Sequence, residues 1–571
     1  MNEALHSLGS RNFLTKFITS TLLLCAVAVT PWWSLDPINL VKLMVISTTG
    51  TACFVILILN WRYVYHNTSK VLFYACLIFL FDLIIVSIFG SMSFSQNFFG
   101  VTGRNTGLLA YSSLLSLLLL SSLISTPLTI NKFGDVLFLA GVISAIYGVF
   151  QAAGLDPIDW VNPYSPVVGF LGNPDFQSAF LGIAASVCMA RTLDSLRKTT
   201  QRIFHALAVF FFAAVIYTTD AQQGLILLFV NLLVFLFIIL VKKRRRFLTF
   251  SYTLFVGFLS LIMLAGSLDK GPLATLLHKA SVIYRGDYWH AAWSMLLSNP
   301  IVGVGLDGYG DWYRRTRTLE ATLRRGPDVY SDASHNVFLD FASNGGFPLL
   351  VLYSLLVGIV VYSIFRIIRR QDEKNFEIYA LIVAWIGFQI QSIISINQIG
   401  LAVWGWVLSG LIIGYDRVKA RQVDSEKISD KFTNVKRKNV TRDISQPGYL
   451  PAAMVLSLFV GSLCGVVVGA IPFKASVEYR NALESGEIED IKAAAYIRPL
   501  TPERMVQIAK TLNDNNFDKE ALTTATDATR YFPDYFQAWS VLSKAKLATP
   551  SQIDLAKKQL IRLDPNNPDL K

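Results

Sequence analysis

The chain has 571 residues, of which 53% are hydrophobic and only 16% charged, and its formal net charge is +12. A mean hydropathy of +0.46 excludes an ordinary soluble domain and indicates a chain that lies mostly in lipid. The positive charge follows membrane topology, as shown below, so we expect no nucleic-acid partner.

Apolar runs of about 17 to 25 residues recur along the chain, each long enough to cross the ~30 Å hydrocarbon core of a bilayer as a helix. About nine such spans fit between Phe13 and Ala265. Four more are expected near residues 344–365, 377–396, 400–415 and 450–471. We therefore predict an all-α, polytopic transmembrane bundle of about thirteen helices in a lipid bilayer.

The positions of Lys and Arg predict the orientation, because cytoplasmic loops retain positive charge and translocated loops do not. With the N-terminus in the cytoplasm, basic runs such as 242–246, 366–374 and 417–442 all lie inside. The short outer loops then contain just Lys42 and Arg104. An odd number of spans places the C-terminus outside the cytoplasm.

The hydrophilic segments divide the chain into four predicted parts. A transmembrane domain covers residues 1–415 and includes a large outer loop at 267–336. Residues 416–449 are charged and lack apolar periodicity, which predicts a disordered cytoplasmic linker. The last transmembrane helix follows at 450–471, and residues 472–571 form an exported tail.

The tail has the pattern of helical repeats. Pro499, Pro533 and Pro565 recur at intervals close to the ~34 residues of a tetratricopeptide repeat. Only about two repeats fit, fewer than the three usually needed for independent stability, so the tail should lean on the membrane domain or on a protein partner. A peptide-binding module and a small helical cap without a ligand both remain open.

Cysteines and acidic residues give no sign of a metal site. The five cysteines fall in separate predicted spans without paired or metal-like spacing, so they are expected to be packing residues. The outer loop contains no Asp-x-Asp motif and no His/Cys cluster. We therefore expect neither a metal nor a cofactor.

Ionisable and aromatic residues gather in the outer loop. Apolar residues at helical spacing from Tyr284 to Leu297 predict a surface helix that holds Trp289 at the headgroup level. The His335-Asn336 pair stands just before an apolar helix, where a histidine is either a helix-end residue or, with cations nearby, a functional one. A further set of loop arginines is expected to contact lipid headgroups; these are Arg314, Arg315, Arg317, Arg324 and Arg325.

The order of Arg285, Trp289, the Pro300 turn and His335-Asn336 resembles the signature of the O-antigen ligase and O-antigen polymerase superfamily. Two upstream segments extend the resemblance to roughly residues 10–415; they are GFLGNPDFQSAFL, with Asn173, and GVTGRNTGLLAY, with Arg104. One departure stands out. Where many members carry an arginine before the eighth span, this chain has Gln222 and Gln223, which can donate hydrogen bonds to a phosphate but bring no positive charge.

The resemblance implies transfer of a glycan from a polyprenyl-diphosphate carrier to a hydroxyl acceptor on the outer face of the cytoplasmic (inner) membrane. Such a site needs cations for the leaving diphosphate, and Arg285 is the first candidate and Arg104 the second. It also needs a general base near neutral pH, for which His335 is suited. The remaining candidates for substrate contact are Gln222, Gln223, Asn173, Asn336 and Trp289. Arg285 could instead be an interfacial anchor, and Asn336 could cap a helix or orient His335.

Several alternatives stay open at this stage. The acceptor could be lipid A core, a growing polysaccharide or a protein side chain. A solute transporter would place ionisable groups near the membrane midplane, where Asp82 is almost alone. A non-catalytic scaffold would recruit partners through the tail, and substitution of the loop histidine would distinguish it from an enzyme.

Overall fold

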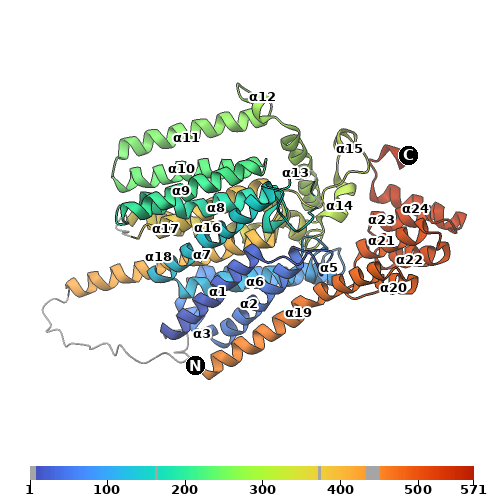
Figure 1. Cartoon of the computed structure of the whole chain (residues 1–571), viewed down its shortest axis with the longest axis horizontal. Coiled ribbons are helices and arrows are strands. Elements are labelled where there is room, and N and C mark those ends of the chain that lie inside the picture. Colours follow the sequence, from blue (N-terminus) through green and yellow to red (C-terminus); the bar gives the residue numbers. More distant parts are fainter. Residues whose placement is uncertain (1–7, 161, 163–164, 371–374, 432–450, 571) are drawn as a thin grey trace.

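The computed structural model describes residues 8–160, 162, 165–370, 375–431 and 451–570, and all regular structure in these ranges is helical. Among them, eleven helices are long and apolar enough to cross a membrane. They are α2 (Asn39–Leu59), α4 (Lys70–Phe89), α7 (Pro127–Ala152), α8 (Pro174–Leu193), α9 (Thr199–Thr218), α10 (Gln222–Lys242), α11 (Arg246–Ser267), α16 (Val337–Arg370), α17 (Glu377–Ile394), α18 (Ile399–Lys431) and α19 (Ala452–Ser485). Helices α1 (Leu8–Val27) and α6 (Leu108–Ile124) run through the same bundle (Figure 1). The prediction of an all-α polytopic membrane bundle is confirmed.

One end of the bundle carries most of the extramembrane structure, and we call it the loop face. Its short helices are α5 (Phe94–Phe99), α12 (Ala274–Leu277), α13 (Ala280–Ser298), α14 (Tyr309–Thr316) and α15 (Leu319–Arg325). The tail lies at the same end, beyond α13 to α15 (Figure 1). The short helix α3 (Trp61–Asn67) lies at the opposite end.

Helix α19 fixes the tail to the bundle through a row of small residues. Gly461, Gly465 and Gly469 follow one another at intervals that place them on one helix face, against α2. A Cβ at Gly465 would lie 2.3 Å from the carbonyl oxygen of Ser47, so there is no room for a larger residue at position 465. Such close backbone approach is the usual way for membrane helices to associate. Helix α19 is therefore packed against α2, although the contacting residues Ser47 and Gly465 are 418 positions apart in the sequence.

The tail consists of α20 (Ile488–Ala494), α21 (Pro502–Asp514), α22 (Asp518–Tyr531), α23 (Phe536–Lys544) and α24 (Pro550–Leu563), followed by the 3₁₀ turn η2 (Pro568–Leu570). Helices α21 and α22 pack as one pair and α23 and α24 as another. Apolar residues such as Met505, Leu512, Leu542 and Leu560 are buried between them. The tail thus has its own small hydrophobic core.

The predicted linker is helical in its first half. Helix α18 continues past the membrane span to Lys431, where disorder was predicted. Asp416, the first residue of the predicted linker, is buried and forms an ion pair of 2.8 Å with Arg370 of α16. This ion pair holds α18 against α16. The sequence pattern gave no sign of it, because the segment lacks apolar periodicity. Residues 432–450 lie outside the described part of the chain.

Candidate active site

His335 lies on the loop face, in a tight turn immediately before α16. Its backbone is left-handed, with φ of 55°. The ring Nδ1 lies 3.2 Å from the carbonyl oxygen of Ala333. Because a carbonyl can only accept, Nδ1 carries the proton in the neutral ring and Nε2 keeps its lone pair. The tautomer required of a general base acting through Nε2 is thereby selected.

The ring of His335 is also held from the side and is partly shielded from water. It stacks on the ring of Tyr288 in α13, with centroids 5.0 Å apart and planes inclined by 29°. Tyr288 is in turn fixed by a hydrogen bond from Arg325 to its hydroxyl. Burial, with the positive charge of Arg285 as a smaller contribution, lowers the pKa of His335 below its ordinary value. The imidazole is therefore neutral, and able to accept a proton, at pH 7.

Asp340, one turn into α16, sets the backbone that presents His335. One of its carboxylate oxygens accepts hydrogen bonds from the backbone N–H of Ser334 at 2.9 Å and from the Ser334 hydroxyl at 2.8 Å. The other oxygen faces Arg104 at 3.6 Å. Asn336 uses its side-chain oxygen to accept from the N–H groups of Phe338 and Leu339, and so caps α16.

Arg104 lies inside the protein, between two carboxylates and a backbone carbonyl. Its guanidinium faces Asp307 at 3.7 Å and Asp340 at 3.6 Å, and donates to the carbonyl oxygen of Asp332 at 3.1 Å. These opposite charges raise the pKa of Arg104 above its ordinary value, although burial acts against them. Arg104, the second candidate from the sequence for a diphosphate-binding cation, ties the first outer loop to the His335 turn through these contacts.

The glycine-rich segment after Pro300 closes against a kink in α16. The N–H groups of Val304 and Gly305 donate to the carbonyl oxygens of Ser343 and Asn344, at 2.8 and 3.0 Å. Gly346 interrupts α16 with φ of 72°, and a Cβ there would lie 2.5 Å from the carbonyl oxygen of Pro300. Only glycine accommodates both this conformation and this approach. The segment thereby delivers Asp307 to Arg104.

Arg285 projects from α13 and is bound to the end of α17. Its Nε donates to the carbonyl oxygen of Ile394 at 2.9 Å, and its Nη1 to that of Ser281 at 3.0 Å. No carboxylate among the described residues lies within ion-pair distance of this guanidinium. Arg285 thus differs from Arg104, since its charge is not neutralised by a paired carboxylate.

Asp175 connects the two predicted catalytic residues, and the sequence did not single it out. Arg285 and His335 both interact electrostatically with its carboxylate, at the start of α8. Asn173 accepts a hydrogen bond from the backbone N–H of Asp175 at 2.8 Å and so caps this helix. The sequence signal that could have identified Asp175 was its position directly after Asn173-Pro174, at the start of a membrane span.

The two glutamines begin α10, beside the same end of α8. The backbone N–H of Gly224 donates to the hydroxyl of Ser178, which lies one turn along α8 from Asp175. Gln223 is buried, and its side-chain oxygen has no hydrogen-bond partner among the described residues. Gln222 is exposed. Both are therefore near the Asp175 end of α8, whereas Trp289 is exposed on α13.

Residues 207–354 match the O-antigen ligase family. The match confirms, for this part of the chain, the resemblance to the O-antigen ligase and polymerase superfamily. The matched region runs from within α9 to within α16, and so includes Gln222, Gln223, Arg285 and His335. No curated protein is significantly similar to the chain.

The domain match supports a membrane enzyme of the glycosyltransferase-like ligase or polymerase type. In this O-antigen ligase-like chain, the matched region supplies the base candidate and the unpaired arginine. Arg104 and Asn173 come from segments upstream of the match. Among the residues that the structure describes, no cluster of three or more His, Cys, Asp or Glu side chains could hold a metal ion.

Proposed function

We propose that this protein transfers a glycan from a polyprenyl-diphosphate carrier to a hydroxyl acceptor, with His335 as general base and Arg285 as the diphosphate-binding cation. The observation that carries the proposal is the stacking of His335 on Tyr288 of α13, because this contact joins the His335 turn to the helix that carries Arg285. The superfamily match supports the reaction class.

The reaction would proceed by direct displacement at the sugar. His335 Nε2 takes the proton of the acceptor hydroxyl as its oxygen attacks the anomeric carbon. The bond from that carbon to the diphosphate oxygen breaks, and the bond to the acceptor oxygen forms. The leaving diphosphate gains negative charge, which Arg285 offsets through its remaining N–H groups. Asp175 stabilises the imidazolium that His335 becomes.

The location of the reaction is part of the proposal. The loop face would lie outside the cytoplasm, with the N-terminus inside and the C-terminal tail outside, in the inner membrane. The substrate-binding roles of Gln222, Gln223 and Asn173 rest on their position at the mouth of α8 and α10. Trp289, exposed on α13, would contact the lipid part of the donor or the headgroups.

The test uses the purified full-length protein in lipid with a defined polyprenyl-diphosphate glycan and an acceptor. His335→Ala should lower the transfer rate by about a hundredfold to ten-thousandfold while donor binding persists. Arg285→Ala should weaken donor use. His290→Ala is the matched control, because His290 is exposed on the same helix as Arg285 and should leave transfer unchanged.

Near-normal transfer by His335→Ala would refute its role as base. The acceptor would be identified separately, by comparing the glycans of a strain that lacks this protein with those of its parent. Accumulation of a lipid-linked glycan with loss of one product would name the acceptor class; unchanged glycans with a lost solute flux would favour transport.

A further inference from the structure

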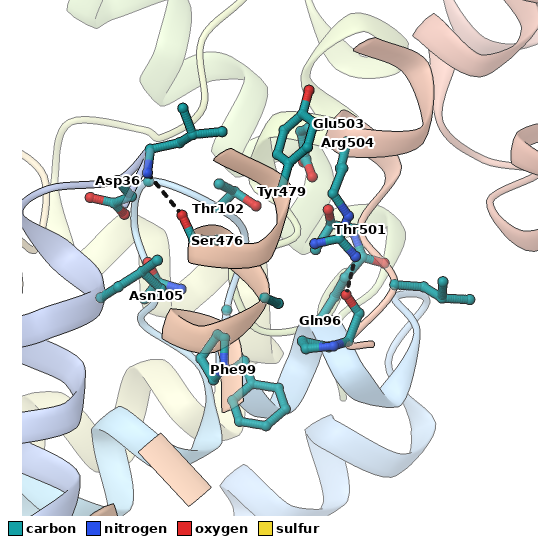
Figure 2. A pocket seen from close by; sticks show the side chains of 18 of the residues that line it. Asp36, Gln96, Phe99, Thr102, Asn105, Ser476, Tyr479, Thr501, Glu503 and Arg504 are labelled. Atoms are coloured by element: carbon teal, nitrogen blue, oxygen red, sulfur yellow. Dashed lines mark hydrogen bonds between the residues drawn. The ribbon is translucent and has the colours of Figure 1, made fainter. Parts of the chain in front are cut away.

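A cavity of about 490 Å³ lies on the loop face where the tail meets the membrane domain. Three segments line it: the loop before α2, the stretch from α5 to Asn105, and the chain from the end of α19 into α21 (Figure 2). Its volume falls within the ~300–1,000 Å³ typical of small-molecule sites. Arg285, His335 and Asp175 are not among its lining residues, so it is separate from the candidate active site.

Buried polar atoms without partners distinguish this cavity from a packing defect. Gln96 Nε2, Asn105 Oδ1 and Arg504 Nε have no hydrogen-bond partner among the described residues, although these side chains are only 5%, 3% and 7% exposed. One carboxylate oxygen each of Asp36 and Glu503 is also buried without a hydrogen-bond partner among the described residues. Buried polar groups in proteins are nearly always paired, so five such atoms around one cavity indicate a missing partner.

The lining groups specify the chemistry of that partner. Gln96 and Arg504 supply donors, whereas Asn105, Asp36 and Glu503 supply acceptors. The rest of the wall is mainly apolar and includes the rings of Phe99 and Tyr479 (Figure 2). A sugar ring suits both features, because its hydroxyls donate and accept while its C–H faces pack on aromatic rings. We infer that the cavity is a saccharide-binding site.

An anionic ligand fits less well. Arg504 is the one cation of the lining, and its Nη2 already donates to the carbonyl oxygens of Ile497 and Pro499. Two carboxyl groups, Asp36 and Glu503, face the same space. A phosphate would therefore meet two carboxyl groups as well as the guanidinium, whereas a neutral polyol can form hydrogen bonds with all three.

The tail forms part of the cavity wall, which gives the tail a role. Pro499, Glu503 and Arg504 close it from one side, and Asn105 from the other. Asn105 follows Arg104, whose guanidinium faces the Asp340 carboxylate that holds the His335 turn. A saccharide bound here would contact Asn105, the residue next to Arg104. The inference concerns binding alone and stands whether or not transfer occurs as proposed.

The test measures saccharide binding by the full-length protein in lipid nanodiscs, with saturation-transfer NMR. The probes are the methyl glycosides of glucose, galactose, rhamnose and N-acetylglucosamine, with inorganic phosphate as a competing ligand class. The near-isosteric variants Gln96→Glu and Glu503→Gln each alter one lining group. Glu487→Gln is the matched control, since Glu487 is exposed in the tail and does not line the cavity.

At least one glycoside should bind, with a Kd raised about tenfold in each cavity variant and unchanged in Glu487→Gln and His335→Ala. Protease resistance of the tail should stay normal in all four variants, which shows that the tail remains docked. Absence of glycoside binding, or binding of phosphate in its place, would overturn the inference. So would binding that survives both cavity variants but is lost in His335→Ala, a result that would still support the proposed transfer.

Discussion

Arg317 and Asp564 form a buried ion pair between the outer loop and the residue that follows α24 in the tail. Arg317 Nη2 lies 2.6 Å from Asp564 Oδ2, and both side chains are almost fully enclosed. Arg314 joins the same carboxylate at 3.1 Å, and Arg315 pairs with Asp534 at 2.9 Å. These arginines were expected to contact lipid headgroups. Their contacts instead show that the tail leans on the membrane domain.

Asp564→Asn should loosen the tail, because it leaves two buried arginines without their shared counter-ion. Breaking such a buried pair typically costs about 3–5 kcal/mol. The expected result is rapid protease cleavage between α19 and the tail helices and a lower thermal midpoint. Asp554→Asn, an exposed carboxyl of the same helix α24, should change neither. Equal protease resistance of the two variants would contradict the importance of this pair.

The helices were predictable from the sequence because the signals that specify them are local. Apolar run length determined the spans, and the helical-repeat pattern located the tail helices, in which Ile508, Ala525 and Leu542 are buried. Tyr531 of α22 and Leu555 of α24 are also apolar, but each is 48% exposed. The continuation of α18 beyond residue 415 was missed because residues 416–431 lack the apolar periodicity on which the prediction relied.

The candidate site was only partly predictable for the same reason. Arg285 and His335 are recognisable by residue type and by their order along the chain. The ion pairs of Arg104 with Asp307 and Asp340 join segments about 200 or more residues apart, and no local pattern encodes such pairs. Asp175 was missed likewise, since its neighbours come from α13 and from the turn before α16.

Asp340→Asn should impair catalysis through the position of His335. The amide would weaken the two hydrogen bonds to Ser334 and would leave Arg104 with one fewer negative neighbour. We expect kcat to fall by about tenfold or more with KM for the donor little changed, and Asp340→Glu to recover part of the loss. Glu320→Gln, at an exposed acid of the outer loop, is the control. A change in KM alone would argue for substrate contact instead.

The pH dependence of transfer should report the pKa of His335. Because burial and Arg285 lower that pKa, activity should persist below pH 6.5 before the acid limb falls. Removing the positive charge in Arg285→Gln should move this limb to higher pH. Removing a negative charge in Asp332→Asn should move it to lower pH, since Asp332 favours the protonated ring. If the acid limb moved in the same direction in both variants, His335 would be excluded as the titrating base.

The orientation of the bundle predicts where each terminus lies. A reporter fused after Lys571 should be active only outside the cytoplasm, and one placed within 432–450 only inside. The physical reason is the retention of Lys and Arg by cytoplasmic segments. The two fusions serve as controls for each other, because a single span, α19, separates them. Activity of both reporters on one side would mean that α19 does not cross the membrane.

Docking of the tail should weaken as the pH rises, through Glu503. Burial raises the pKa of this carboxyl to about 7, against an ordinary value of 4.5, with smaller contributions from its hydrogen bond to Thr102 and from Arg504, which act in the opposite direction. The pKa of Asp311, which faces Glu503 from α14, is raised too, because it is buried and the two acids repel each other.

A carboxyl whose pKa is higher when docked binds its proton more tightly in that state, so its contribution is fully present below pH 4.5 and lost as the pH rises through 7. The protonated docked state should therefore be favoured at pH 6 relative to pH 8, by an amount on the order of 1–2 kcal/mol for one such group. Hydrogen exchange in α21 should accelerate between these values beyond the intrinsic effect of pH. Glu503→Gln, which cannot ionise, should remove most of this excess, whereas Glu487→Gln should retain it. An unchanged excess in Glu503→Gln would assign the pH response to other groups, with Asp311 the next to be substituted.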